Sequence, residues 1–253
     1  MTSDVQYFVR KITQNCEWLN YNRQDYRPFQ IKFVLGAPIA LTVPWVNFDG
    51  LLGHLMLLHS LGRDYFLLPA KLNIRPYLRG HARYVPLKRT GKVTHASVSI
   101  LEPNVAKLTT LYKRFEADTT RLGRYRTRKI RLGSGYYRLH ALQTPYVAAK
   151  TVTFYVNGVF DLIRDLIKSH VFALGNEIRV GFGVVRDIEF TLLSEDWSLV
   201  KDGKAMRPIP VEMCEEYEMA TMLAYKAPYW HPDSVELCVP PGAKCKLKKC
   251  YET

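Results

Sequence analysis

Runs of apolar residues divide the first seventy positions of the chain into four expected elements. Apolar residues recur every three to four positions over residues 5–19, which predicts a leading helix. Residues 29–35 instead alternate between apolar and polar side chains, the period of a half-buried strand. A nearly continuous apolar run over residues 51–60, stopped by Gly62, predicts a buried helix, and residues 65–69 form a second, short strand candidate.

A second strand–helix–strand pattern begins near residue 147. β-Branched and aromatic residues over 147–156 predict a strand, and apolar residues at helical spacing predict a helix over 160–174 that ends at Gly175. After a short loop, residues 184–193 form the last expected strand. Two halves of this size fit an α+β, ferredoxin-like sheet with both helices on one face. The other face of such a sheet is open to a partner, as in the related RNA-recognition module.

Less regular sequence separates and follows these two halves. Residues 71–146, punctuated by proline and glycine, form a long insertion between the second and third core strands. Residues 194–253 are rich in proline and predict an irregular C-terminal region with one short helix over 212–225. We therefore expect an N-terminal helix and linker (1–28), a core with its insertion (29–193) and a C-terminal extension (194–253).

Charge changes this picture because it is concentrated in one place. The 253 residues carry a formal net charge of +13. Residues 71–139 alone hold 17 basic and 3 acidic side chains, a net of +14, so the rest of the chain is close to neutral. Segregated basic charge of this kind is typical of a surface that binds a polyanion.

The remaining composition narrows the class of protein. The longest apolar run is well short of the ~20 residues that cross a bilayer, so we expect no contact with a membrane. The first residues lack the pattern of a secretory signal, and the five cysteines do not resemble a disulfide framework. These observations favour a cytoplasmic protein.

The densest basic stretch has the chemistry of a phosphate-binding arm. Six of the eleven residues 121–131 are basic, and they repel one another unless a polyanion neutralises them. Arg124, Arg126 and Arg128 share one face of an extended chain, and guanidinium groups grip phosphates bidentately. Tyr125 is placed to stack on an unpaired base. The alternative interpretations are a solvated loop that aids solubility and a contact with an acidic membrane surface.

We therefore expect the insertion to supply most of the RNA contacts. The candidate residues in it are Arg75, Arg79, Arg83, Lys88, Arg89, Arg121, Arg124, Tyr125, Arg126, Arg128, Lys129, Arg131 and Arg138.

A glycine pair forms a second candidate contact. Gly181 and Gly183 flank Phe182, and Arg179 and Arg186 lie on either side. Glycines let backbone amides approach a phosphate closely. A helix precedes this loop and a strand follows it, so the context of a dinucleotide site or P-loop is missing and we expect no nucleotide cofactor. A tight turn that only closes the sheet fits the local sequence equally well.

The sequence offers little support for catalysis or for a metal site. No nucleophile elbow, zinc-protease signature or kinase motif is present, so we expect no catalytic residue. The cysteines after residue 213 include no CxxC pair, which argues against zinc.

Several short strings, taken in order, resemble a known family. They are the segment 29–45 followed by NFDGLL at 47–52, VGFGVV at 180–185 after Leu174-Gly175, MRPIP at 206–210 and APYW at 227–230. Together they resemble the Cas-five-like subunit (Csf-three) of type IV CRISPR-Cas effector complexes, over roughly residues 29–241. The family belongs to the RAMP superfamily, whose members have a ferredoxin-like core and a glycine-rich loop before the last core strand.

This resemblance implies an RNA-binding structural subunit rather than an enzyme. Such a subunit binds the 5′ handle of the CRISPR RNA and caps the filament of backbone subunits. Its expected partners are CRISPR RNA, the backbone and large subunits, and target DNA near the end of the complex. Because some relatives cut repeat RNA, a metal-independent endoribonuclease is the alternative, with His140 or His95 as the base.

Overall fold

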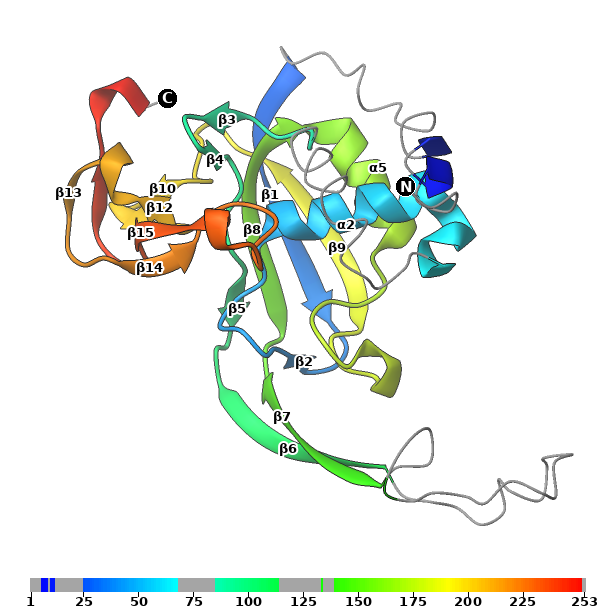
Figure 1. Cartoon of the computed structure of the whole chain (residues 1–253). Helices are drawn as coiled ribbons and strands as arrows, with labels where there is room; N and C mark the ends of the chain where they lie inside the picture. Colours follow the sequence, from blue (N-terminus) through cyan, green and yellow to red (C-terminus); the bar gives the residue numbers. More distant parts are fainter. Residues whose placement is uncertain are drawn as a thin grey trace, which may run out of the picture.

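The computed structural model describes residues 6–8, 10–11, 25–67, 85–113, 133 and 139–251. This part of the chain is a mixed α/β structure with several small antiparallel sheets and few helices (Figure 1).

The main sheet has four strands, and all of its neighbouring pairs are antiparallel. They are β1 (Tyr26–Leu35), β5 (Ile100–Glu102), β8 (Thr151–Val159) and β9 (Val185–Leu192). Their order across the sheet is β5-β8-β1-β9. β1 is central, because Ile31 lies opposite Phe154 on β8 and opposite Phe190 on β9.

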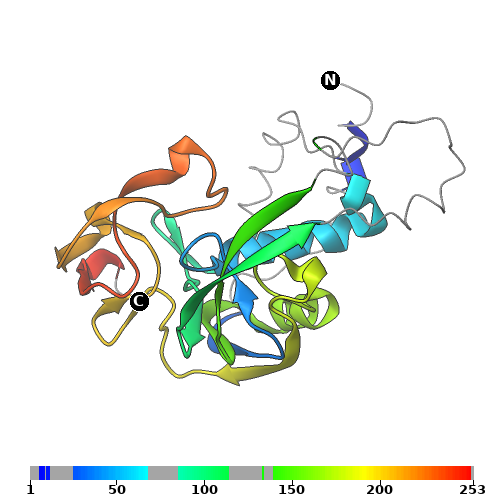
Figure 2. The same ribbon diagram turned by 90° about the horizontal axis from the view of Figure 1, so that it is seen from below.

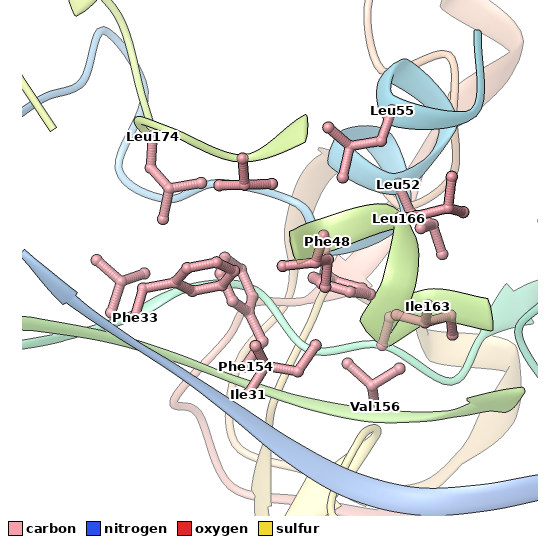
Figure 3. Close-up of a cluster of buried hydrophobic side chains, with 14 of the residues drawn as sticks. Ile31, Phe33, Phe48, Leu52, Leu55, Phe154, Val156, Ile163, Leu166 and Leu174 are labelled. Carbon is pink, nitrogen blue, oxygen red and sulfur yellow. The ribbon is translucent and has the colours of Figure 1, made fainter. Parts of the chain in front are cut away.

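Two helices cover one face of this sheet. α2 (Phe48–Leu61) and α5 (Phe160–His170) lie side by side on it (Figure 1). Alternate side chains of β1 and β8 point into the core beneath them, where the Phe33 and Phe154 ring centroids are 5.9 Å apart. Figure 3 shows these rings with Phe48 and the inward leucines of both helices. Burial of this apolar face is the main stabilisation of the layer.

The second core strand is not where the sequence analysis placed it. Residues 65–69 were expected to form a strand, but Gly62–Leu67 forms a 3-10 helix that directly continues α2. The fourth strand of the sheet is β5, inside the predicted insertion, and it has only three residues. Three residues are too few to show the period of a strand, which explains why the pattern did not reveal it.

A long hairpin, here called the arm, leaves the core between β5 and β8. It consists of β6 (Ala106–Lys113) and β7 (His140–Val147), paired along their full length. At its base β7 also pairs with β2 (Ile39–Ala40), which makes a three-stranded sheet. Figure 1 shows the arm projecting from the body below the main sheet, and Figure 2 views it from that side. A smaller hairpin, β3 (Arg89–Thr90) with β4 (Val93–Thr94), precedes β5.

The C-terminal region is more ordered than its proline content predicted. The helix expected over residues 212–225 is absent: these positions form a short 3-10 turn, a strand, a bend and a second strand. The strands of this region are β10 (Val200–Lys201), β11 (Lys204–Ala205), β12 (Ile209–Pro210), β13 (Cys214–Tyr217), β14 (Thr221–Ala224), β15 (Val235–Val239) and β16 (Cys245–Leu247). They enclose a separate hydrophobic cluster, and residues 198–251 are here called the C-terminal lobe.

A buried arginine joins this lobe to the core. Arg207 is 1% exposed and its guanidinium donates to the backbone carbonyls of Thr94 and Tyr225, both at 2.6 Å. It also donates to the Asp49 carboxylate at the start of α2, at 3.3 Å. Tyr229 completes the cluster by donating its hydroxyl to the same carboxylate. Burial and the Asp49 charge raise the pKa of Tyr229 well above its usual value, which keeps that hydroxyl protonated.

The described part of the N-terminal segment also packs on the core. Residues 6–8 and 10–11 are helical, as predicted. Phe8 is buried, and Tyr7 donates to the Asp64 carboxylate at 2.7 Å.

Candidate nucleic-acid interface

The predicted RNA-binding residues fall into two groups. Most of those in the basic insertion lie outside the described residues, namely Arg75, Arg79, Arg83, Arg121, Arg124, Tyr125, Arg126, Arg128, Lys129, Arg131 and Arg138. The described ones are Lys88, Arg89, Arg179, Gly181, Phe182, Gly183 and Arg186. The chain connectivity nevertheless places residues 114–139 between the far ends of β6 and β7. The densest basic stretch is therefore joined to the arm at the end away from the core.

The arm itself is a two-stranded ribbon with exposed apolar and basic side chains. Leu108 is 61% exposed and Tyr112 is 66% exposed. On the opposite face of the ribbon, Lys107 lies across from Tyr146, and Lys113 lies across from His140. A ribbon with cations and an aromatic ring on one face suits the backbone and bases of a single strand of nucleic acid.

The glycine loop packs against the base of this arm. The ring of Phe182 contacts the ring of Tyr146 on β7, with centroids 5.8 Å apart. Because Tyr146 faces Lys107, the contact brings the loop next to the basic face of the arm. The glycine loop and the base of the arm, which the sequence analysis treated separately, are therefore in contact.

The two glycines of the loop have different environments. Gly183 has a φ of 65°, and a Cβ there would lie 1.8 Å from the carbonyl oxygen of Leu174. Its amide donates to Pro38 at 2.7 Å and its carbonyl accepts from the amide of Leu174 at 2.9 Å. Gly181 has a φ of 97° and open space around its Cβ position. Gly183 therefore closes the fold, and Gly181 is the glycine that a ligand can approach.

Both arginines that flank the loop are exposed. Arg179 lies in the 3-10 turn Ile178–Val180 just before Gly181, and Arg186 is the second residue of β9. Their guanidinium groups are available to phosphates on this side of the molecule.

Lys88 and Arg89 lie far from this surface. The amide of Lys88 donates to Asn157, which lies opposite Pro28 near the start of β1. The glycine loop instead meets the chain just after Leu35, at the end of β1. The length of β1 separates the two groups by about 25 Å, given ~3.4 Å per strand residue. These two predicted contact residues therefore lie outside the surface that the arm and the glycine loop form.

The open face of the main sheet carries charged and aromatic side chains. Lys32 on this face pairs with Glu189 of β9 at 3.1 Å, and Asp187 and Glu102 add further negative charge. Tyr155 is 7% exposed because Trp197 packs against it, with ring centroids 5.5 Å apart. Acidic side chains repel phosphates. Lys201 adds a positive charge on the same face, with its Nζ 4.5 Å from the centroid of the Tyr155 ring. The face that the sequence analysis left open to a partner therefore carries mixed charge.

One of the two histidines considered as a catalytic base is unavailable. His95 is 0% exposed, and its ring nitrogens bond to Thr90 Oγ1 at 2.6 Å and Asp196 Oδ2 at 2.7 Å. Burial raises the pKa of Asp196, but hydrogen bonds from His95, Ser198 and Asn157 outweigh this and hold the pKa far below its usual range. His95 therefore joins the β3–β4 hairpin to the chain after β9. His140, at the outer end of β7, is exposed.

Within the described residues, no group of three or more histidine, cysteine or acidic side chains is arranged to hold a metal ion.

The sequence did not indicate two features of this region. The contact between Phe182 and Tyr146 joins residues 36 positions apart, and no local pattern signals it. The second is strand β6: its residues 108–112 are leucine, threonine and tyrosine without strict alternation, and they lie within a segment interpreted as irregular.

The comparisons with known proteins agree with the resemblance noted in the sequence. Residues 97–241, which include the arm, the glycine loop and most of the C-terminal lobe, match a family model for a CRISPR-associated protein of type IV systems. The family is described as CRISPR type IV associated protein Csf3, and the match covers more than half of the chain. The chain belongs to this family.

Other comparisons add little. A chain of the cryo-EM structure of the Type III-B Cmr-beta bound to cognate target RNA overlaps with a TM-score of 0.36 and 12% sequence identity, covering 75% of this chain and 67% of that chain. At this TM-score the similarity bears on neither the fold nor the function. A comparison with curated proteins found no match. Among the described residues, no helix is long and apolar enough to cross a membrane.

Proposed function

We propose that this chain is a non-catalytic RNA-binding subunit of a type IV CRISPR ribonucleoprotein. In this role it binds the 5′ handle of the CRISPR RNA and caps one end of the filament of backbone subunits. The observation that carries the proposal is the arm, which joins the basic stretch 114–139 to a glycine loop packed at its base.

The arrangement of the main sheet supports a ferredoxin-like core of the RAMP type. Strand order β5-β8-β1-β9, antiparallel pairing and two helices on one face are the features of that core. The proposed division of the chain into regions 1–28, 29–193 and 194–253 accompanies this assignment. RNA contacts come from the arm and the glycine loop, since the open face of the sheet carries acidic side chains.

The proposed partners follow from the family and the charge. They are CRISPR RNA at the arm, backbone and large subunits against the body, and target DNA near the same end of the complex. A body close to neutral with one basic arm suits local contact with an RNA end, whereas a filament subunit needs basic surface along its whole RNA-facing side.

Salt-dependent binding tests the RNA contact. We expect the triple variant Arg124→Ala, Arg126→Ala and Arg128→Ala to bind repeat RNA more weakly. Its slope of log affinity against log salt should fall by about 2, or about 0.7 for each lost phosphate contact with a single strand. The matched control is Arg164→Ala with Lys168→Ala on α5, which removes charge away from the arm and should leave the slope unchanged. An unchanged slope in the triple variant contradicts the assignment.

Native mass spectrometry tests the capping role. Co-expression with guide RNA and backbone subunits should give particles that contain one copy of this chain. Many copies per RNA, or a stable homo-oligomer without RNA, would contradict capping but leave RNA binding by the arm intact.

A further inference from the structure

Two buried cysteines face each other in the C-terminal lobe. Cys214 begins β13 and Cys245 begins β16, and these two strands are antiparallel neighbours. Their Sγ atoms are 3.2 Å apart, and the residues are 4% and 5% exposed. Cys214 lies opposite Leu247, which shares the buried face of β16 with Cys245, so both sulfurs point into the same core.

The surroundings shift the pKa values of the two cysteines in opposite directions. The hydrogen bond between the two sulfurs lowers the pKa of Cys214, and the positive charge of Lys248 adds to this effect against the cost of burial. The same hydrogen bond and burial raise the pKa of Cys245. Cys214 is therefore the sulfur that more readily becomes a thiolate, the nucleophilic form of cysteine.

A groove borders the residue that carries one of the two sulfurs. It has a volume of about 690 Å³ and lies between the β10–β11 hairpin and the β13–β16 pair. Cys245 lies in its wall together with Gly203, Tyr217 and Leu247. Cys214 is not part of this wall, so the groove approaches the pair from the side of Cys245.

We propose that Cys214 and Cys245 are a redox pair that a hydroperoxide converts into a disulfide between β13 and β16. The Cys214 thiolate attacks the peroxide, the O–O bond breaks, and sulfenic acid forms with release of hydroxide or alkoxide. The Cys245 sulfur then displaces the sulfenic oxygen, which leaves as water with the thiol proton. The S–S bond length of about 2.05 Å requires the two sulfurs to approach by a little over 1 Å.

The cross-link would close a loop that contains two residues through which the lobe contacts the core. The loop between Cys214 and Cys245 contains Tyr225, whose carbonyl accepts from Arg207, and Tyr229, which bonds to Asp49. Closing this loop reduces the conformational freedom of the unfolded chain. We expect oxidation to raise the thermal midpoint by roughly 5 to 15 °C.

Peptide mapping of the full-length chain tests the proposal. The protein is treated with a small excess of hydrogen peroxide under native conditions, alkylated and digested without reduction. The expected product is a peptide that joins Cys214 to Cys245 and that is lost after treatment with a phosphine reductant. Cys238 serves as the buried control, because burial raises its pKa to about 12 and its thiol faces the Leu223 carbonyl at 3.7 Å.

The variants separate the proposed pair from other thiol chemistry. Cys214→Ser and Cys245→Ser should each abolish the peroxide-dependent rise in thermal midpoint, whereas Cys238→Ser and Cys250→Ser should retain it. If a serine variant fails to fold, peptide mapping of the unsubstituted chain is sufficient to test the proposal. Full alkylation of both cysteines after peroxide treatment, a cross-link through Cys238 or Cys250, or over-oxidation to separate sulfinic acids would overturn the proposal.

Discussion

Replacing Arg207 with methionine should show how strongly the C-terminal lobe depends on the core. Methionine has an unbranched chain that fills much of the same space but cannot donate a hydrogen bond. The change removes donors from the carbonyls of Thr94, Ala96 and Tyr225 and leaves the Asp49 carboxylate, 4% exposed, without its counter-ion.

The expected loss in free energy of unfolding follows from the number of hydrogen-bond partners that Arg207 leaves unsatisfied. A buried acceptor that loses its donor costs about 1–3 kcal/mol, and breaking a buried ion pair costs about 3–5 kcal/mol. These costs overlap because the same guanidinium serves both, and Asp49 keeps hydrogen bonds from Thr94 and Tyr229. We therefore expect Arg207→Met to lower the free energy of unfolding by about 4 kcal/mol, a large share of the typical total of 5–15 kcal/mol.

Urea denaturation followed by tryptophan fluorescence and by far-ultraviolet circular dichroism measures this loss. Because the core and the lobe have separate hydrophobic clusters, the two probes should also cease to coincide in the variant. The control is Arg164→Met on α5, whose partners Asp161 and Asp165 are both exposed, and it should cost under about 1 kcal/mol. A loss below about 1 kcal/mol for Arg207→Met, with coincident transitions, would refute the reasoning.

Three further predictions concern the loop, the arm and the pH dependence of stability. Gly183→Ala should reduce the yield of folded protein, since its methyl group clashes with Leu174. Gly181→Ala meets no neighbouring atom and should still fold, with some loss of stability from its φ of 97°, and it should bind RNA more weakly; circular dichroism and filter binding distinguish the two variants. Tyr146→Ala should weaken RNA binding several-fold with an unchanged salt slope, because it removes the contact with Phe182 but no cation. The depressed pKa of Asp196 stabilises the fold above the unfolded value of about 3.9, so stability should fall as pH drops below about 4, and Asp196→Asn should flatten this dependence in urea titrations.

The elements that the sequence predicted are the long periodic ones. The strand over 29–35 and the helix over 51–60 are present as β1 and α2, with a few residues added at their ends. The helix over 160–174 is present but ends at His170, because the next residues turn to meet the glycine loop. In each of these elements the apolar face was long enough to show its period.

The elements that the sequence missed are short or are set by distant contacts. The strands of the C-terminal lobe have two to five residues, and their burial depends on partners elsewhere in the chain. Arg207 shows the same limit, since nothing next to it in sequence indicates that Asp49 lies beside it. His95 was a candidate base because of its basic neighbours, and its burial comes from Asp196, about a hundred residues away.

Hydrogen bonds at the end of β1 fix the base of the arm relative to the glycine loop. Leu35 and Gly36 at the end of β1 donate to Lys150 and Val184, both at 2.8 Å, so the strand end is held between β8 and the glycine loop. The next residues form β2, which pairs with β7 of the arm, while the carbonyl of Pro38 accepts from Gly183. The arm, the glycine loop and the end of β1 are therefore one hydrogen-bonded unit. A shift of the loop must move the arm with it, so the packing around Gly183 sets the direction in which the arm leaves the core.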